Sequence, residues 1–401
     1  MAIDLPALGQ QLVQHLEQYA HAVPAGATGL PAAGTFMDSA AFSTHSFKHE
    51  WLVEKVLVAN QPGVIGGMKK TLKTSLMIDL GVSLASGGAV KFLGKFKVPK
   101  AKRVALISGE SGPATLQETA KRVCHAKGLN LAELPIFWNF SVPRLSDEGD
   151  LKSLRKAIQD HGFEVVAIDP LYLSLLASNS NIQASNLYQI GPLLKGVADA
   201  CLEAGATPLV IHHSRKTQGA KHNFGPMELD DLAFSGISEF ARQWMLLGRR
   251  KAYEAGSGRH ELWLSVGGSA GFSGMWAVDV NEGTLHEDFT GRTWSVQVRT
   301  AAEVNATEAA IKAEQKHQKT AAKQTSKDAE DRNKLLKALE EFPEGETQSE
   351  IADKAGVPRG KAKPLLAQLV EDGHVEQVKV TKGAGSAGSR QYAGFKLKQA
   401  K

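Results

Sequence analysis

A glycine turn followed by lysine and hydroxyl side chains is the stretch of this sequence best suited to chemistry. It lies after the apolar pair Val64-Ile65 and before an apolar helical pattern that starts at Ser75. A polyphosphate needs converging backbone N–H groups, a helix N-terminus, a cation and a hydroxyl that holds magnesium. This order of elements predicts a phosphate loop that binds ATP with Mg²⁺. The residues expected to contact the nucleotide are Gly66, Gly67, Met68, Lys69, Lys70, Thr71, Leu72, Lys73, Thr74 and Ser75.

Three residues of this loop have defined expected roles. Gly67 opens the turn, Lys73 reaches the β- and γ-phosphates, and Thr74 ligates Mg²⁺. Leu72 stands where the G-x-x-x-x-G-K-[ST] pattern has its second glycine, so the match is incomplete. The alternative interpretation is a glycine turn followed by a lysine-rich helix start.

Two carboxylates follow predicted strands downstream of the loop. Asp169 closes the apolar run 165–168, which is the Walker B arrangement, and Glu110 follows a buried strand predicted over 102–108. Nucleotide hydrolysis needs a carboxylate in the magnesium shell and a group that orients or deprotonates the attacking water. Ligands of open α/β sheets bind at such strand ends. The alternatives are a turn-capping aspartate and a solvated loop glutamate.

A histidine pair and several arginines complete the candidate set. His212 and His213 end another predicted strand, where a histidine can hydrogen-bond the γ-phosphate; alternatively, one imidazole packs and the other caps. The loop that follows carries the candidate nucleic-acid contacts Arg215, Lys216 and Lys221. Candidates for an arginine finger, which neutralises charge on the transferring phosphoryl group, are Arg242 and the pair Arg249-Arg250.

Strands and helices are expected to alternate around these residues. Alternation at this spacing favours an α/β fold with a largely parallel sheet covered on both faces. Three further strands, expected to be antiparallel, extend that sheet. The expected strands are 102–108, 135–142, 164–168, 208–211, 243–248, 262–266 and 275–280, and the expected helices are 116–127, 147–161 and 185–204.

Composition is that of a soluble globular protein of 401 residues, with more than one domain expected. No apolar run approaches membrane-spanning length, and the N-terminus has no basic start followed by an apolar block, so neither a membrane partner nor a signal peptide is expected. Cys124 and Cys201 lie far apart in apolar patterns, which indicates reduced core thiols and a cytoplasmic location. The net charge of +5 has its excess at the C-terminal end, from Lys354 onward.

The C-terminal part reads as a separate module. Three helical patterns, 333–342, 348–355 and 359–372, precede two short strands around a glycine-rich stretch, which describes a winged helix-turn-helix. We expect domains at 1–34 (flexible extension), 35–300 (ATPase core), 301–330 (charged helical or disordered linker) and 331–398 (winged helix). The residues expected to face phosphates or bases are Arg359, Lys361 and Lys363; a protein-docking module is the alternative.

The order of motifs in the core resembles the RecA-like ATPases of the RepA replicative-helicase type. The resemblance is carried by residues 51–54, 67–74, 108–110, 168–170, 212–214 and 235–244, and covers more than half of the chain. It implies a RecA-like three-layer P-loop core in which Lys73 and Thr74 bind phosphate and Mg²⁺, Glu110 activates water and Asp169 holds the metal shell. It further implies that His212 and His213 sense the γ-phosphate and that Arg242 acts across a subunit interface.

The same resemblance implies a ring, usually hexameric, with nucleotide at each interface and nucleic acid in its channel. We expect single-stranded DNA at the core and, from the C-terminal module, duplex DNA at the winged helix. ATP-dependent action on DNA in replication, including helicase activity, is the function we expect. Because the fold does not select between activities, two alternatives stay open. One is a DNA-binding regulator that ATP controls, and the other is a recombination or repair ATPase.

Overall fold

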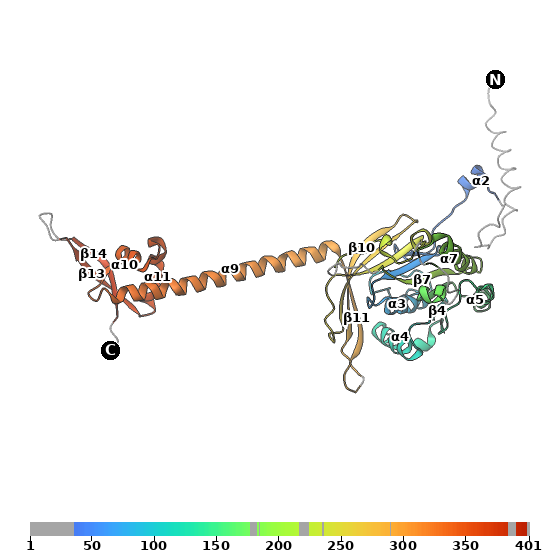
Figure 1. Ribbon diagram of the computed structural model, residues 1–401, viewed down its shortest axis with the longest axis horizontal. Coiled ribbons are helices and arrows are strands. Elements are labelled where there is room, and N and C mark those ends of the chain that lie inside the picture. The colour runs from blue at the N-terminus through green and yellow to red at the C-terminus, as the bar shows by residue number, and fades with distance from the viewer. Residues whose placement is uncertain are drawn as a thin grey trace, which may run out of the picture. The chain divides into compact units, whose positions relative to one another are not determined.

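The computed structural model describes residues 36–176, 183, 185–215, 224–234, 236–288, 290–383 and 390–398. The chain divides into two compact units, Met1–Val304 and Asn305–Lys401, which are coloured along the chain in Figure 1. The expected flexible extension, 1–34, lies outside the described residues.

The first unit is built on a nine-stranded sheet with the order β11-β10-β9-β8-β3-β7-β6-β4-β5. The six strands from β8 to β5 in this order are mutually parallel. Because parallel strands are covered on both faces, they read as continuous apolar runs, as the sequence indicated. Their bounds are β3 (Gly63–Gly67), β4 (Val104–Ser108), β5 (Ile136–Asn139), β6 (Val165–Asp169), β7 (Thr207–His213) and β8 (Gln243–Arg249).

Three antiparallel strands extend the sheet beyond β8, namely β9 (Arg259–Gly268), β10 (Ser273–Gly283) and β11 (Arg292–Thr300). Two expectations are corrected here. β8 pairs parallel with β3 and antiparallel only with β9, so it belongs to the parallel core. β11 was not predicted, although its alternating Trp294, Val296 and Val298 have the period of two typical of a half-buried strand.

Helices cover both faces of this sheet (Figure 1). Alternate residues of each central strand enter different cores: Leu106 packs in the cluster with helices α3 and α4, and Ile107 in the cluster with α5 and α7. The three-layer α/β architecture predicted from the sequence is therefore confirmed. The helices are α2 (Ser39–Thr44), α3 (Lys73–Ala85), α4 (Pro113–Lys127), α5 (Glu148–His161), α6 (Leu171–Leu176), α7 (Leu187–Leu202) and α8 (Ile237–Phe240), and two short strands, β1 (Trp51–Val53) and β2 (Leu57–Val58), precede β3.

The second unit is a helix-turn-helix with a small antiparallel sheet of order β12-β14-β13. Its core joins residues such as Leu335, Ile351 and Leu366 from three helices. The helix expected at 333–342 is the last part of a longer helix, α9, and the stretch 301–330 is helical throughout. The elements are α9 (Ala301–Glu340), β12 (Glu346–Thr347), α10 (Gln348–Ala355), α11 (Arg359–Glu371), β13 (Val375–Lys382) and β14 (Arg390–Leu397).

Within the described residues, no helix combines the length and apolar character needed to cross a bilayer. Both cysteines are buried and unpaired, as the sequence indicated.

Candidate nucleotide site

The register of the sheet brings the candidate residues to one edge. Gly67 lies opposite His213 in the β3–β7 pair, and Ser108 lies opposite Asp169 in the β4–β6 pair. The carboxyl ends of four parallel strands therefore meet where β3 leads into the phosphate loop, which is where open α/β sheets bind ligands.

The two glycines at the end of β3 lie in close packing. A Cβ on Gly67 would lie 2.8 Å from the Leu247 carbonyl oxygen, and one on Gly66 would lie 2.5 Å from Cδ2 of Leu232. Because the Leu247 oxygen belongs to the backbone of the neighbouring strand, a side chain on Gly67 would force the two strands apart.

Leu72 occupies the last position before α3 in a left-handed conformation, with φ 61° and ψ 26°. Its carbonyl oxygen accepts the first helical hydrogen bond, from the Leu76 N–H, at 2.8 Å. Glycine adopts this conformation without steric cost, whereas an L-residue loses about 1–2 kcal/mol. The Leu72 side chain packs partly buried against the core, which offsets that cost. The incomplete match to the loop pattern therefore leaves a glycine-like backbone in place.

Lys73 begins α3 and is only 7% exposed. Its Nζ donates to the Met68 carbonyl oxygen at 2.8 Å, and the Thr71 hydroxyl donates to the same oxygen at 2.8 Å. Burial lowers the pKa of Lys73 to about 8, while the nearby charges of Asp169 and Glu110 act in the opposite direction. A desolvated ammonium enclosed by a loop is well placed to bind a phosphate oxygen.

Thr74 and Asp169 form the closest polar contact of the site. The Thr74 hydroxyl donates to Oδ2 of Asp169 at 2.6 Å. Asp169 is 3% exposed, and its burial raises the pKa of the carboxyl to about 6. A hydroxyl and a carboxylate at this separation are oxygen ligands of the kind that Mg²⁺ takes directly or through water, together with phosphate oxygens. These residues fit an ATP-bound Mg²⁺.

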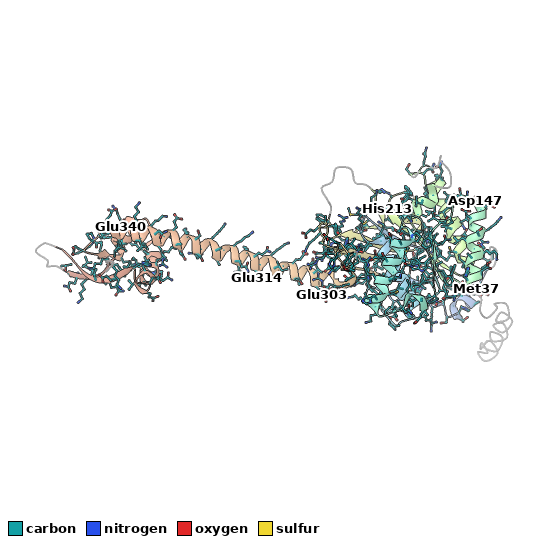
Figure 2. All side chains as sticks on the ribbon, turned by 90° about the horizontal axis from the view of Figure 1, so that it is seen from below. Met37, Asp147, His213, Glu303, Glu314 and Glu340 are labelled. Atoms are coloured by element: carbon teal, nitrogen blue, oxygen red, sulfur yellow. The ribbon has the colours of Figure 1, made fainter. Side chains whose placement is uncertain are left out.

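Glu110 and His213 lie at the outer end of the same site. Nε2 of His213, labelled in Figure 2, is 3.8 Å from Oε2 of Glu110, which is too long for a hydrogen bond. Burial and the nearby Lys73 charge lower the pKa of His213, so the imidazole is neutral at physiological pH. The Glu110 side chain is half exposed, and water therefore has access to its carboxylate.

His212 faces the other side of β7. Its Nε2–H donates to the Ala233 carbonyl oxygen at 2.9 Å, and its ring packs 4.9 Å from that of Phe234. Burial lowers the pKa of His212 to about 4, so the ring is neutral. This position fastens the 232–234 segment to β7. Its expected contact with the γ-phosphate stays a prediction.

Arg242 lies at the amino-terminal end of the parallel strands, whereas the phosphate loop lies at their carboxyl-terminal end. It precedes β8, whose Gln243 pairs with Gly63, whereas Leu247 pairs with Gly67. The four residue steps from Gln243 to Leu247 span about 13 Å, so Arg242 does not reach the nucleotide of its own subunit. Its expected action across a subunit interface stays a prediction.

Arg249 ends β8 on the side of the loop, and its Nη2 donates to the Lys69 carbonyl oxygen at 3.3 Å. Sequence reasoning named the Arg249-Arg250 pair without selecting it. The parallel pairing of β8 with β3, which the sequence pattern missed, is what directs Arg249 to the site. Arg250 is buried and paired with Glu261 and Asp279, so its role is structural.

The candidate nucleic-acid residues have different environments. Arg215 is held by donation from its Nε to the Leu232 carbonyl oxygen at 2.8 Å, and Lys216 and Lys221 lie outside the described residues. In the second unit Lys363 is exposed on α11, whereas Arg359 pairs with Asp353 on α10.

Lys361 departs from the expectation that it faces DNA. Its Nζ lies 2.8 Å from Asp328 and 2.7 Å from Asp331, both on α9. The charge of Lys361 is thus used to hold α11 against α9.

Residues 35–219 match the family model described as AAA domain. The core unit therefore contains an AAA-type P-loop ATPase domain. Its phosphate loop, β6 and β7 all fall within the matched residues, while the antiparallel extension of the sheet lies beyond them. Residues 334–379 match the family model described as IclR helix-turn-helix domain, which identifies the fold of the second unit. No curated protein matches the chain.

Proposed function

We propose that the ATPase domain binds ATP with Mg²⁺ at residues 66–75 and hydrolyses it, and that the protein uses this cycle to act on DNA. The observation that supports the proposal is the convergence of Lys73, Thr74, Asp169 and Glu110 at one edge of the sheet. A cation, a hydroxyl, a magnesium-shell carboxylate and a second carboxylate are the parts that phosphoryl transfer to water requires.

In the proposed reaction Glu110 accepts a proton from a water molecule whose oxygen attacks the γ-phosphorus. The bond from this phosphorus to the bridging oxygen breaks, and ADP leaves with the electron pair. Lys73 binds the phosphate oxygens on which charge develops, and Arg249 is placed to contact the same end of the loop. A bound Mg²⁺ would supply charge neutralisation to the β- and γ-phosphates.

The DNA activity that we favour is that of a RepA-type replicative helicase. In this proposal single-stranded DNA contacts the core through the loop that begins at Arg215. Duplex DNA contacts the helix-turn-helix, with Lys363 on the exposed face of α11. Arg242 would act from a neighbouring subunit of a ring.

The decisive experiment compares ATP turnover of the wild type and Glu110→Gln, with and without single-stranded DNA. We expect Glu110→Gln to bind ATP but to lose about 10²–10⁴-fold in turnover. We also expect single-stranded DNA to stimulate turnover by the wild type and not by Glu110→Gln. Glu148→Gln, an exposed change on α5, is the matched control and should hydrolyse ATP normally. Normal turnover by Glu110→Gln would refute the assignment of the base.

The second candidate function is an ATP-controlled DNA-binding regulator. It is favoured by the match of the second unit to the IclR helix-turn-helix domain. Tight binding to one duplex sequence with negligible ATP turnover would support the regulator, and ATP-dependent strand displacement would support the helicase. Filament formation without strand displacement would favour the recombination or repair ATPase.

A further inference from the structure

The exposed part of α9 carries a stripe of five lysines, which we call the lysine stripe: Lys312, Lys316, Lys319, Lys323 and Lys327. Spacings of three and four residues place all five within an arc of about 80° around the helix. Every residue from 309 to 327 is exposed, and Figure 2 shows the side chains around the labelled Glu314 projecting from the helix. Glu314, the one acidic residue in this stretch of the sequence, lies on the opposite side of the helix.

The lysine stripe is unfavourable for the helix on its own. Lys312 and Lys316, Lys319 and Lys323, and Lys323 and Lys327 are like-charge pairs at i,i+4 spacing, which destabilise a helix. Three exposed lysines on α5 and α7 differ, because each forms an ion pair with an acidic residue four positions away: Lys152 with Glu148, Lys156 with Asp160 and Lys195 with Asp199. Among the described residues, the ion pairs of α9 gather at 328–334 and include none of the five. Lys327 is the stripe residue beside this cluster, and its charge contributes to the lowered pKa of Asp331. A polyanion would neutralise this repulsion.

We propose that the lysine stripe binds the phosphate backbone of duplex DNA and adds a sequence-independent contact to that of the helix-turn-helix. This inference rests on the proposed DNA binding of the second unit. The stripe spans about 22 Å of helix, and duplex DNA presents one charge per roughly 1.7 Å of its axis, so phosphates are dense enough for every lysine to meet one.

Two features of the second unit favour DNA over other polyanions. The exposed residues of α11 include two cations, Lys363 and Arg359, of which Arg359 is paired with Asp353, and one anion, Glu371, so this helix by itself supplies little phosphate binding. The stripe ends one residue before Asp328, where Lys361 fastens α11 to α9. The C-terminal end of the lysine stripe therefore lies beside the helix-turn-helix, and the stripe provides the charge that α11 lacks.

The test measures binding of the full chain to a labelled duplex of arbitrary sequence between about 50 mM and about 200 mM salt. The stripe variant combines Lys316→Gln, Lys319→Gln and Lys323→Gln, and it keeps good helix formers at all three positions. The control variant combines Lys152→Gln, Lys156→Gln and Lys195→Gln, which removes the same charge from exposed positions on helices of the first unit. Circular dichroism checks that both variants retain their helix content.

Each lost phosphate contact should lower the slope of log affinity against log salt by about 1. We therefore expect the stripe variant to lose about 2–3 from the slope and at least about tenfold in affinity at the lower salt concentration, with the control and the ATPase rate unchanged. An unaltered slope in the stripe variant, or an equal loss in the control, would overturn the inference. If Lys363→Ala lowered the slope and the stripe variant did not, the proposed DNA binding would stand without the stripe. A wild type that binds no duplex would refute both.

Discussion

The Thr74 hydroxyl and Oδ2 of Asp169 are joined by a hydrogen bond of 2.6 Å across 95 positions of sequence. The contact ties the first turn of α3 to the tip of β6, two strands away from β3 in the sheet. It brings together the two oxygen ligands that an ATP-bound Mg²⁺ would use.

The first prediction concerns the Thr74 hydroxyl. Thr74→Val keeps the shape of the side chain and removes the ligand oxygen, so the Mg²⁺ requirement for ATP hydrolysis should rise by about 10–100-fold. Thr74→Ser keeps the hydroxyl and serves as the control. A magnesium titration of ATP turnover measures both variants, and similar magnesium dependence for valine and serine would argue against Thr74 as a ligand.

The second prediction is that Asp169→Asn stabilises the protein without nucleotide and Mg²⁺. Burial raises the folded-state pKa of Asp169 from 3.8 to about 6. The unfolding free energy therefore falls as pH rises through this range, because the folded state disfavours the charged carboxylate. At neutral pH the variant should gain about 1–3 kcal/mol in unfolding free energy. We expect a gain near the lower end of this range, because the variant also removes the attraction between Asp169 and the nearby Lys73 ammonium. Urea denaturation in chelator measures the gain.

Asp150→Asn provides the control of opposite sign. Hydrogen bonds from Arg144 lower the pKa of Asp150 to about 2, so its charged form favours the folded state above this range. Removing that charge should leave stability at neutral pH unchanged or reduced. If Asp169→Asn also lost stability, burial would not destabilise the charged carboxylate of Asp169.

The third prediction is the pH dependence of ATP binding. Lys73 must be protonated to hold phosphate, and its pKa is lowered to about 8, so affinity should fall as pH rises through about 8. Asp169 must be ionised to hold Mg²⁺, so magnesium-dependent affinity should also fall below about pH 6. Lys73→Arg keeps its charge at high pH and should lack the alkaline fall. Nucleotide binding by fluorescence across this range tests both limbs; a flat profile up to pH values near the ordinary lysine pKa would contradict the first.

The fourth prediction concerns Leu72. At ordinary helical positions alanine is more stabilising than glycine by roughly 0.5–1 kcal/mol. At φ 61° the order should reverse, with Leu72→Gly more stable than Leu72→Ala by about 1 kcal/mol, because glycine alone avoids the left-handed penalty. Both variants lose the same packing, so their difference isolates the backbone. Thermal denaturation of the pair decides the sign, and equal stability would indicate that the loop relaxes.

The fifth prediction separates two lysines of the second unit. Lys361→Met should destabilise this unit, because it removes the closer of the two cations that pair with the buried Asp331 and leaves Lys334 at 3.9 Å, while the salt dependence of DNA binding stays unchanged. Lys363→Ala should have the opposite pattern, with normal stability and a salt slope lower by about 1. Denaturation and duplex binding, both measured on the full chain, test the pair. Identical behaviour of the two variants would refute the distinction.

The sequence by itself determined the phosphate loop, the alternation of buried strands and helices, and the second unit. Each depends on a local pattern: a glycine turn before a lysine and hydroxyl, short apolar runs, or helical spacing before a hairpin. The sequence also placed Glu110 and Asp169 at strand ends, because an apolar run that stops at a carboxylate marks the end of a buried strand. These features need no knowledge of distant neighbours.

Only the tertiary structure decided which side chains meet. Whether Arg242 or Arg249 lies near the loop depends on the direction of β8, which is set by its pairing with β3 some 180 residues earlier. The different surroundings of His212 and His213 follow from what packs on each face of β7. Lys361 pairs with α9 instead of facing outward because α11 packs its N-terminal turn against that helix. In each case the deciding contact joins segments that are distant in sequence, and strand direction and facing are properties of that pairing rather than of the local pattern.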